Sequence, residues 1–291
     1  MKDLDQEPAP GPTYLVAQRF RYEYTRPVHR LRHRLMVLPP DRHGDQRTLT
    51  SRVSASLPAE ERRWTDEFGN TAVEFEVPVV ESAVEFEARI VVSRDGSEGP
   101  FMEAAGWLTD PRLLEPSTLT APSRSLARVA RRLRARAADG LARAEAVSWW
   151  THRALTYERG VTGVHTTATG ALELRRGVCQ DYAHVMLALC RLVGLPARYV
   201  SGHLLGEGGT HAWVEVLLPD PSGSGLAAAF AFDPTHGGRV GAGHVTVATG
   251  RDYLDVAPTA GTYVGAAGGR LSATRRMDVL DLDDADRQRS A

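Results

Sequence analysis

Three residues in the middle of the chain have the types and the settings that acyl-transfer chemistry needs. Cys179 opens a run of apolar residues at helical spacing, His211 opens an alternating apolar run, and Asp233 stands just before a proline. A thiolate can attack a carbonyl carbon, an imidazole can hold and return the proton, and a carboxylate can orient the imidazole. These residues are therefore predicted to be a catalytic set that acts through a thioester.

The residues after Gly177 are predicted to form a helix that begins near Cys179. Gly194 can supply a left-handed cap and Pro196 bars continuation, and the apolar residues ahead of them repeat at helical spacing: Tyr182, Val185, Met186, Leu189 and Val193. Unpaired amides and the positive dipole end at a helix N-terminus favour the negative charge of a thiolate. Cys190 comes eleven residues after Cys179, inside the apolar stretch, and is predicted to be an inert core residue.

Three strands are predicted to bring the other two residues to this helix. Residues 197–205 and 212–218 flank a glycine-rich turn, which is typical of an antiparallel hairpin, and His211 stands at the entrance of the second strand. Residues 226–232 are predicted to return beside the hairpin. This return places Asp233 near His211, and the hairpin brings His211 towards the helix that bears Cys179.

Three stretches resemble the core of a known enzyme family: GVCQDYAHVMLALCRLVGLPARYVSG, THAWVEVLLP and FDPTHG. They are similar to the blocks that carry the catalytic residues in the transglutaminase-like superfamily of papain-like cysteine enzymes. The resemblance implies Cys179 as the nucleophile, His211 as the general base and acid, and Asp233 as the residue that orients His211. It also implies a papain-like α+β core in which the helix bearing the cysteine packs on an antiparallel sheet.

Two features depart from the family pattern. Phe230 and Phe232 stand where relatives often carry a tryptophan ahead of the aspartate, and His203 stands where relatives frequently carry a tyrosine. The contacts of the site with its substrate are therefore expected to differ from those of relatives. The three catalytic residues themselves match the family blocks.

The first third of the chain is predicted to be an antiparallel β-sandwich. Short segments between residues 13 and 92 alternate at period two, and the sequence DEFGNT at residues 66–71 has the glycine and asparagine that a hairpin turn accepts. Several such strands without a strong helical pattern favour a two-sheet fold. The DEFGN turn and the preceding pattern also resemble the N-terminal β domain often found ahead of bacterial transglutaminase-like cores.

The chain as a whole is predicted to have an α+β fold in two domains. Helices are expected from residue 124 towards 138 and from residue 141 to about 155, ahead of the cysteine-bearing helix. The predicted divisions are a disordered tail over residues 1–12, the sandwich over 13–95, a linker over 96–123, the catalytic domain over 124–275 and an acidic C-terminal tail over 276–291.

Charge and hydropathy argue against some classes of partner. The 291 residues carry 35 basic and 36 acidic side chains, so the composition gives no reason to expect nucleic acid or an anionic membrane. The arginines between residues 124 and 136 lack interleaved aromatic residues and are predicted to form a solvated helical face. No secretory signal and no apolar run of membrane-spanning length occurs, and the chemistry requires a free thiol, so a cytoplasmic location is expected.

No cofactor and no metal is expected. The sequence has neither a P-loop nor a G-x-G-x-x-G pattern. The residues that could be considered as zinc ligands are Cys179, His184, Cys190 and His211. His184 and Cys190 are six residues apart, which on a helix turns them to different faces, and the C-x-x-C and H-E-x-x-H patterns of zinc sites are absent.

Two kinds of function fit these residues. The first is attack on an amide or ester carbonyl of a peptide, a protein or a small amide, followed by release of the acyl group to water or to an amine. The backbone amide of Cys179 is the natural first donor to the oxyanion. The alternative is a non-catalytic protein-binding module that keeps the scaffold. Loss of a catalytic residue would indicate that module, and none is lost.

Overall fold

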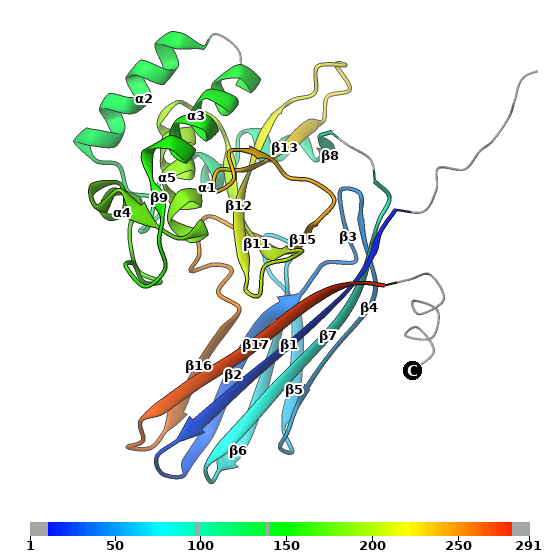
Figure 1. Ribbon diagram of the computed structural model, residues 1–291. Coiled ribbons are helices and arrows are strands. Elements are labelled where there is room, and N and C mark those ends of the chain that lie inside the picture. The colour runs from blue at the N-terminus through cyan, green and yellow to red at the C-terminus, as the bar shows by residue number, and fades with distance from the viewer. Residues whose placement is uncertain (1–10, 97–98, 138–139, 281–291) are drawn as a thin grey trace, which may run out of the picture.

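The structure is a computed structural model that describes residues 11–96, 99–137 and 140–280 (Figure 1). It has two parts, a long antiparallel β-sandwich and a core in which helices cover one face of another sheet. The predicted α+β class is confirmed. Residues 1–10 of the predicted N-terminal tail and residues 281–291 of the predicted C-terminal tail lie outside the described residues.

The sandwich consists of two antiparallel sheets whose inner faces share one apolar core. Its strands are β1 (Thr13–Tyr24), β2 (Val28–Leu38), β3 (Arg42–His43), β4 (Gln46–Ala55), β5 (Glu60–Thr65), β6 (Thr71–Val80), β7 (Ala83–Arg94), β16 (Thr259–Val264) and β17 (Gly269–Leu280). One sheet has the order β17-β1-β7-β4-β3 and the other has the order β16-β2-β6-β5. In β7, buried Val84, Phe86, Ala88 and Ile90 alternate with more exposed residues, because one face of a half-buried strand meets the core.

The last two strands correct the predicted domain boundaries. β17 pairs with β1 along its length, from Thr13 opposite Leu280 to Tyr24 opposite Gly269, and β16 pairs with β2. The sandwich therefore resumes at residue 259, and neither the predicted end of the catalytic domain at residue 275 nor the predicted tail from residue 276 describes this region. Most side chains of β17 are exposed, and the strand is held at the edge of the sheet by its backbone hydrogen bonds. Because its sequence is mostly polar, no apolar alternation indicated a strand here.

The core sheet contains the predicted hairpin and its return strand. The hairpin is β11 (Ala197–Leu204) and β12 (His211–Pro219), and the return strand is β13 (Ala227–Asp233). The remaining strands are β8 (Phe101–Glu103), β14 (Gly238–Arg239) and β15 (His244–Gly250). The order is β14-β13-β12-β11-β15, with β8 paired to β13. A separate short parallel pair, β9 (Thr156–Tyr157) and β10 (Arg176–Gly177), precedes the cysteine-bearing helix.

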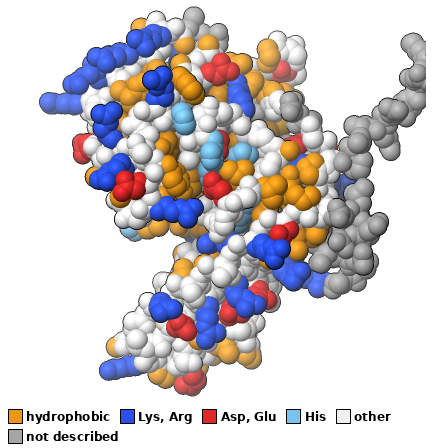
Figure 2. Space-filling model, in the orientation of Figure 1, with side chains coloured by type: hydrophobic (Ala, Val, Ile, Leu, Met, Phe, Trp, Pro, Cys, Tyr) orange, Lys and Arg blue, Asp and Glu red, His pale blue; other side chains and the backbone are white. Residues whose placement is uncertain are grey.

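Helices cover one face of this sheet (Figure 1). They are α2 (Arg124–Arg136), α3 (Gly140–Ala154), α4 (Ala168–Leu174) and α5 (Cys179–Leu192). α5 packs on alternate residues of β12, namely Ala212, Val214, Val216 and Leu218. The arginines of α2 are exposed, as predicted, and Figure 2 shows a row of basic side chains over this helix. No helix of the described residues is both long and apolar enough to cross a bilayer.

The segment predicted to be a linker, residues 96–123, covers the opposite face of the core sheet. Its described part contains β8, a 3-10 helix η1 (Ala105–Leu108) and α1 (Pro111–Leu114). Leu113 is fully buried and clusters with Leu217, Ala227 and Ala229 of the sheet. The segment is therefore packed structure rather than a free connection.

Side chains of the sandwich close the edge of the core sheet at β15. The Gln46 amide donates to the Thr246 carbonyl and accepts from the Thr246 N–H, both at 2.8 Å. Asn70, from the predicted turn at residues 66–71, bonds Thr249 in the same two ways at 2.7 Å. These buried amides replace the partners that a neighbouring strand would give. The two domains are thus joined in a fixed register.

Candidate active site

The N-terminus of α5 is fixed by a close approach between Gly177 and Asp181. The Asp181 carboxylate accepts hydrogen bonds from the N–H of Val178 at 2.8 Å and from the hydroxyl of Thr162 at 2.7 Å. A Cβ added at Gly177 would lie 2.5 Å from an oxygen of this carboxylate, so a side chain there would displace it. Asp181 therefore holds the turn that presents Cys179 as the first residue of α5.

Cys179 lies at the predicted position and is partly open to solvent. Its Sγ is 4.0 Å from the carbonyl oxygen of Thr210, the residue that leads into β12. Its backbone N–H is in the first turn of α5, and amides there have no partner within the helix. The sulfur and a hydrogen-bond donor for an attacked carbonyl are therefore contributed by the same residue.

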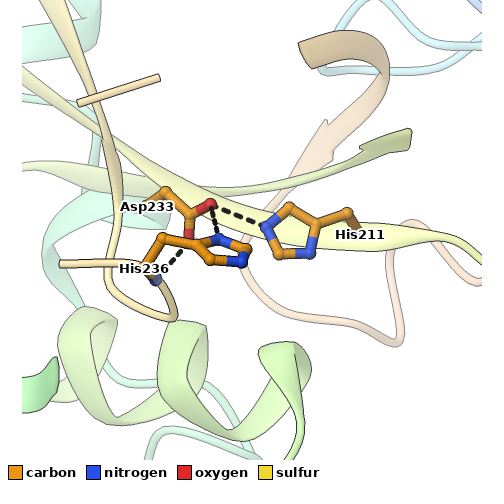
Figure 3. Close-up of side chains that lie close together, drawn as sticks. All are labelled: His211, Asp233 and His236. Carbon is orange, nitrogen blue, oxygen red and sulfur yellow. Dashed lines mark hydrogen bonds and ion pairs between the residues drawn. The ribbon is translucent and has the colours of Figure 1, made fainter. Parts of the chain in front are cut away.

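His211 and Asp233 form a buried hydrogen-bonded pair (Figure 3). Nε2 of His211 lies 2.8 Å from Oδ2 of Asp233, and each residue is 1% exposed. The pair follows from the sheet, because β12 and β13 are neighbours and Val214 lies opposite Phe232. The structure thus brings these two predicted residues together. Their catalytic roles remain a prediction.

Asp233 accepts hydrogen bonds from three imidazoles. Besides His211, Nδ1 of His236 lies 2.7 Å and Nε2 of His244 lies 3.2 Å from its Oδ2 (Figure 3 shows the first). Its Oδ1 accepts from the N–H groups of Thr235 and His236. Burial raises the pKa of Asp233, but the hydrogen bonds from the imidazoles outweigh burial and hold that pKa well below its ordinary value. The carboxylate is therefore ionised at neutral pH.

The imidazole of His211 is stabilised in its protonated form. Burial lowers the pKa of His211, but the hydrogen bond to Asp233 and the nearby side chain of Cys179 outweigh burial and raise the pKa from 6.5 to about 10. Because Nε2 is held by Asp233, Nδ1 is the nitrogen left to face the thiol. An imidazolium at neutral pH is the partner that a thiolate needs.

Trp213 lies behind His211 and fixes the ring from one side. The indole is fully buried, and its ring centroid is 6.1 Å from that of His211 and 5.3 Å from that of His244. It passes over Gly202 of the neighbouring strand, where an added Cβ would lie 2.5 Å from the indole. A larger residue at position 202 would therefore push Trp213 against the two histidines.

Four polar side chains at this site were not predicted from the sequence: His236, His244, Glu207 and Arg159. One oxygen of Glu207 lies 3.3 Å from Nδ1 of His211, and the other lies 3.6 Å from Nε2 of His236. Fully exposed Arg159 interacts electrostatically with Glu207 and Cys179. Figure 2 shows histidine side chains gathered in the middle of the visible face of the core. No pattern in the sequence indicates these contacts, although Glu207 precedes His211 by four residues and His236 follows Asp233 by three.

A buried ion cluster is centred on Glu215 of β12, two residues after Trp213. The Glu215 carboxylate accepts from Arg198 at 2.6 Å and pairs with Nε2 of His43 at 2.7 Å, and Arg198 also donates to Glu103 at 2.7 Å. Burial raises the pKa of Glu215, but His43 and Arg198 outweigh burial and lower it to about 2. A cavity of about 520 Å³ beside this cluster is lined by Trp213 and Glu215 but by none of the predicted catalytic residues.

The residues considered for zinc do not gather at one point. Cys190 is buried, and burial raises its pKa to about 12, as suits an inert core thiol. Among the residues that the structure describes, the one close set of metal-ligand atoms is that of His211, Asp233 and His236, within 4.8 Å of one another. These donors suit a divalent transition metal, but here they are hydrogen-bonded to each other.

Sequence comparisons give two matching families and several relatives. Residues 14–93 match the bacterial transglutaminase-like N-terminal region, and residues 127–225 match the transglutaminase-like superfamily. An uncharacterized protein of Mycobacterium leprae (strain TN) is 29% identical over 247 residues, which cover 78% of this chain and 85% of that protein. An uncharacterized protein of Mycobacterium tuberculosis (strain ATCC 25618 / H37Rv) is 38% identical over 121 residues, or 36% of this chain and 37% of that protein.

A solved structure shares the fold across both domains. It is that of a candidate cysteine protease from Cytophaga hutchinsonii, with a TM-score of 0.70 and 22% identity, and the match covers 94% of this chain and 92% of that one. The resemblance identified from the three sequence stretches and the DEFGN turn is therefore confirmed by the family matches. The chain therefore has a core that matches the transglutaminase-like superfamily, preceded by a region that matches the bacterial transglutaminase-like N-terminal region.

Proposed function

We propose that the protein is a cysteine-dependent acyltransferase or hydrolase that acts on amide or ester carbonyls of a peptide, a protein or a small amide. Cys179 is the nucleophile, His211 moves the proton, and Asp233 orients His211. The observation that carries the proposal is the buried 2.8 Å hydrogen bond between His211 and Asp233, on an imidazole whose pKa is raised by Asp233 and by the side chain of Cys179.

Acylation begins with the thiol proton on His211, so that an imidazolium faces a thiolate. The sulfur attacks the carbonyl carbon, a C–S bond forms, and the carbonyl oxygen becomes an oxyanion that accepts from the amide of Cys179. His211 then gives its Nδ1 proton to the leaving nitrogen or oxygen. The bond from carbon to that leaving atom breaks, and a thioester on Cys179 remains.

Deacylation reverses the proton transfers. The nitrogen of an amine or the oxygen of water attacks the thioester carbon and loses a proton to His211. The C–S bond breaks, and the thiolate forms again opposite the imidazolium. Asp233 stays hydrogen-bonded to Nε2 through both halves, which keeps Nδ1 turned to the reacting atoms.

An ester burst tests the proposal without knowledge of the natural substrate. Mixing the protein with p-nitrophenyl acetate should give a stoichiometric burst of p-nitrophenol, and mass spectrometry should find an acetyl group on the peptide that contains Cys179. Cys179→Ala should abolish both signals. His211→Ala should slow acylation by about a thousandfold, because no base then takes the thiol proton.

Cys190→Ala is the matched control, since burial raises the pKa of that thiol to about 12 and keeps it from reacting. It should retain the burst and the acetylated peptide. An equal burst from the wild-type protein and from Cys179→Ala would contradict the proposal. No burst from any form, with the fold intact by circular dichroism, would favour the alternative of a protein-binding module.

The acyl acceptor is tested with a glutamine peptide library, with and without a primary amine. Incorporation of the amine indicates transfer, and release of ammonia without incorporation indicates hydrolysis. The chain contributes one lysine, Lys2, so the enzyme adds few competing amines of its own. Water and an amine both fit the steps above.

A further inference from the structure

One carboxylate lies on the side of His211 where groups leave and enter. Glu207 is in the turn between β11 and β12, where its N–H donates to the Leu204 carbonyl at 3.0 Å. One of its oxygens is 3.3 Å from Nδ1 of His211, and the other is 3.6 Å from Nε2 of His236. Its side chain is 28% exposed, whereas that of Asp233 is 2% exposed. Glu207 is therefore the carboxylate of the site that solvent reaches.

The two nitrogens of His211 have different tasks in this arrangement. Nε2 is hydrogen-bonded to Asp233, so every proton exchanged with a leaving or entering group passes through Nδ1. An exchanging atom must come within hydrogen-bond distance of Nδ1, about 3 Å. Because Glu207 is at a similar distance from Nδ1, any group that leaves or enters passes beside its carboxylate.

In the acyl-enzyme, where His211 has given its proton to the leaving group and is neutral, the other charges at the mouth of the site do not cancel Glu207. Oδ2 of Asp233 is occupied by three imidazoles. Arg159 is fully exposed and hydrogen-bonded to Tyr157, and its interaction with Glu207 is electrostatic, without a hydrogen bond between them. Water screens a fully exposed cation strongly. The electrostatic potential beside Nδ1 is therefore negative near Glu207, and Arg159 opposes it only weakly.

We propose that Glu207 makes the leaving-group and acceptor side of the site selective for cationic groups, in particular a primary ammonium, over neutral ones. The inference rests on the proposed function, since it concerns the second substrate of the same thioester. A primary ammonium can donate hydrogen bonds to the partly exposed carboxylate of Glu207 while its nitrogen lies near Nδ1. A neutral nucleophile gains no comparable attraction there.

In the transfer step the ammonium loses two protons. A bound ammonium passes one proton through Glu207 to solvent and becomes a neutral amine. The amine nitrogen attacks the thioester carbon and gives a second proton to neutral His211. The C–N bond forms, the C–S bond breaks, and Cys179 leaves as a thiolate opposite the imidazolium. The products are an amide, one proton in solvent and the resting site.

Partition of the acetyl-enzyme tests this proposal. The protein is acetylated with p-nitrophenyl acetate at pH 8 and offered cadaverine, which is cationic, and methoxyamine, which is neutral. The acetylated products and acetate are quantified by mass spectrometry. In Glu207→Gln, the rate constant for cadaverine relative to methoxyamine should fall about three- to fivefold, the effect of one partly exposed charge. Arg159→Gln should shift the same ratio upward by a smaller factor.

Two controls keep the test specific to the charge at this position. Glu207→Asp keeps the carboxylate and should keep most of the selectivity. Glu61→Gln removes the same charge from exposed strand β5 of the sandwich and should leave the ratio unchanged. Both nucleophiles are tested on every variant, so the difference in their intrinsic reactivities cancels when the ratios of two variants are compared.

The outcomes separate this inference from the proposed function. A Cys179-dependent burst with an unchanged ratio in Glu207→Gln would overturn the inference and leave the function standing. Equal slowing of both nucleophiles would also overturn it, because Glu207 would then assist proton transfer without selecting charge. Absence of any Cys179-dependent burst would reject the proposed function and the inference together.

Discussion

The two faces of the core sheet bury their residues by different means. Towards α5, β12 presents Val214 and Val216, which are fully buried among apolar side chains of the core itself. On the other face, Glu215 is equally buried but depends on Arg198 and on His43 of the sandwich. The first face is closed by the helices of the core. On the second face, the segment 96–123 covers Leu217 and Ala229, and the carboxylate of Glu215 also takes a partner from another domain, His43.

The difference shows where the domains depend on each other. Apolar burial is non-directional and adjusts to modest changes of shape. A buried carboxylate instead requires each donor in place, since an unpaired charge away from water is costly. The core therefore needs a correctly placed polar partner from the sandwich on its second face, whereas Met36 and Ala72 of the sandwich join the α5 face through apolar contact alone.

Removing the carboxylate of Glu215 should give the largest loss of stability. Glu215→Ala leaves Arg198 buried without its closest partner, which should cost about 3–5 kcal/mol. Val216→Ala, the adjacent change on the α5 face, should cost about 2 kcal/mol through lost apolar burial. Urea unfolding followed by circular dichroism measures both. The double change Arg198→Met with Glu215→Leu should recover much of the loss, and no recovery would argue against an unpaired charge as its cause.

A pH titration of stability should show the next effect, through His203. This residue of β11 pairs with Val245, which packs into the sandwich core, and burial lowers the pKa of His203 to about 4. Between pH 6.5 and about 4, His203 is therefore protonated in the unfolded chain but neutral in the folded chain. Stability should fall as the pH falls through this window, by up to about 3 kcal/mol from this group.

His203→Gln cannot titrate and is the matched variant. It should lose less stability between pH 7 and pH 5 than the wild-type protein in urea unfolding. A slope identical to that of the wild-type protein would mean that other groups cause the acid sensitivity.

Loss of the donor from the sandwich should weaken the second face by a smaller amount. His43→Ala removes one hydrogen bond to the Glu215 carboxylate but leaves Arg198, so the expected cost is about 2 kcal/mol. His43→Gln can still donate and should cost less. If the alanine variant were as stable as the wild-type protein, the dependence between domains would have to run through other contacts, such as those of Gln46 and Asn70 with β15.

The smallest effect is expected on the helical side. The Ser123 hydroxyl accepts from the N–H of Leu126 at the start of α2, at 3.3 Å. Ser123→Ala should cost about 1 kcal/mol in thermal unfolding, and Ser123→Asp should restore the cap. A loss as large as that of Glu215→Ala would remove the contrast between the two faces.

The elements that could be predicted are those with a local pattern. Apolar residues at helical spacing, followed by Gly194 and Pro196, predicted the helix that begins at Cys179. Alternation of apolar residues predicted β11 and β12 to within a few residues. The closeness of His211 and Asp233 followed from neighbouring strands with short connections. The closing strand β17 was missed, because its sequence is mostly polar and its partner is at the other end of the chain.

The polar contacts around the site could not be predicted, for a related reason. His43 and Glu215 are 172 positions apart, and nothing in either local sequence indicates which loop covers which carboxylate. His244 reaches Asp233 because β15 folds across the hairpin, and Glu207 reaches His211 because of the conformation of a glycine-rich turn. Such contacts are fixed by tertiary packing, which periodicity does not encode.

The pairing of β1 with β17 has a consequence for synthesis of the chain. The ribosome makes β1 first and β17 last, with the whole core between them, so one edge of β1 must wait unpaired while the core emerges and folds. The pairing of Thr13 with Leu280 also brings the outer ends of these strands to one corner of the molecule. Fluorescent labels attached at these two positions would therefore be close neighbours, and energy transfer between them would report when the sandwich closes.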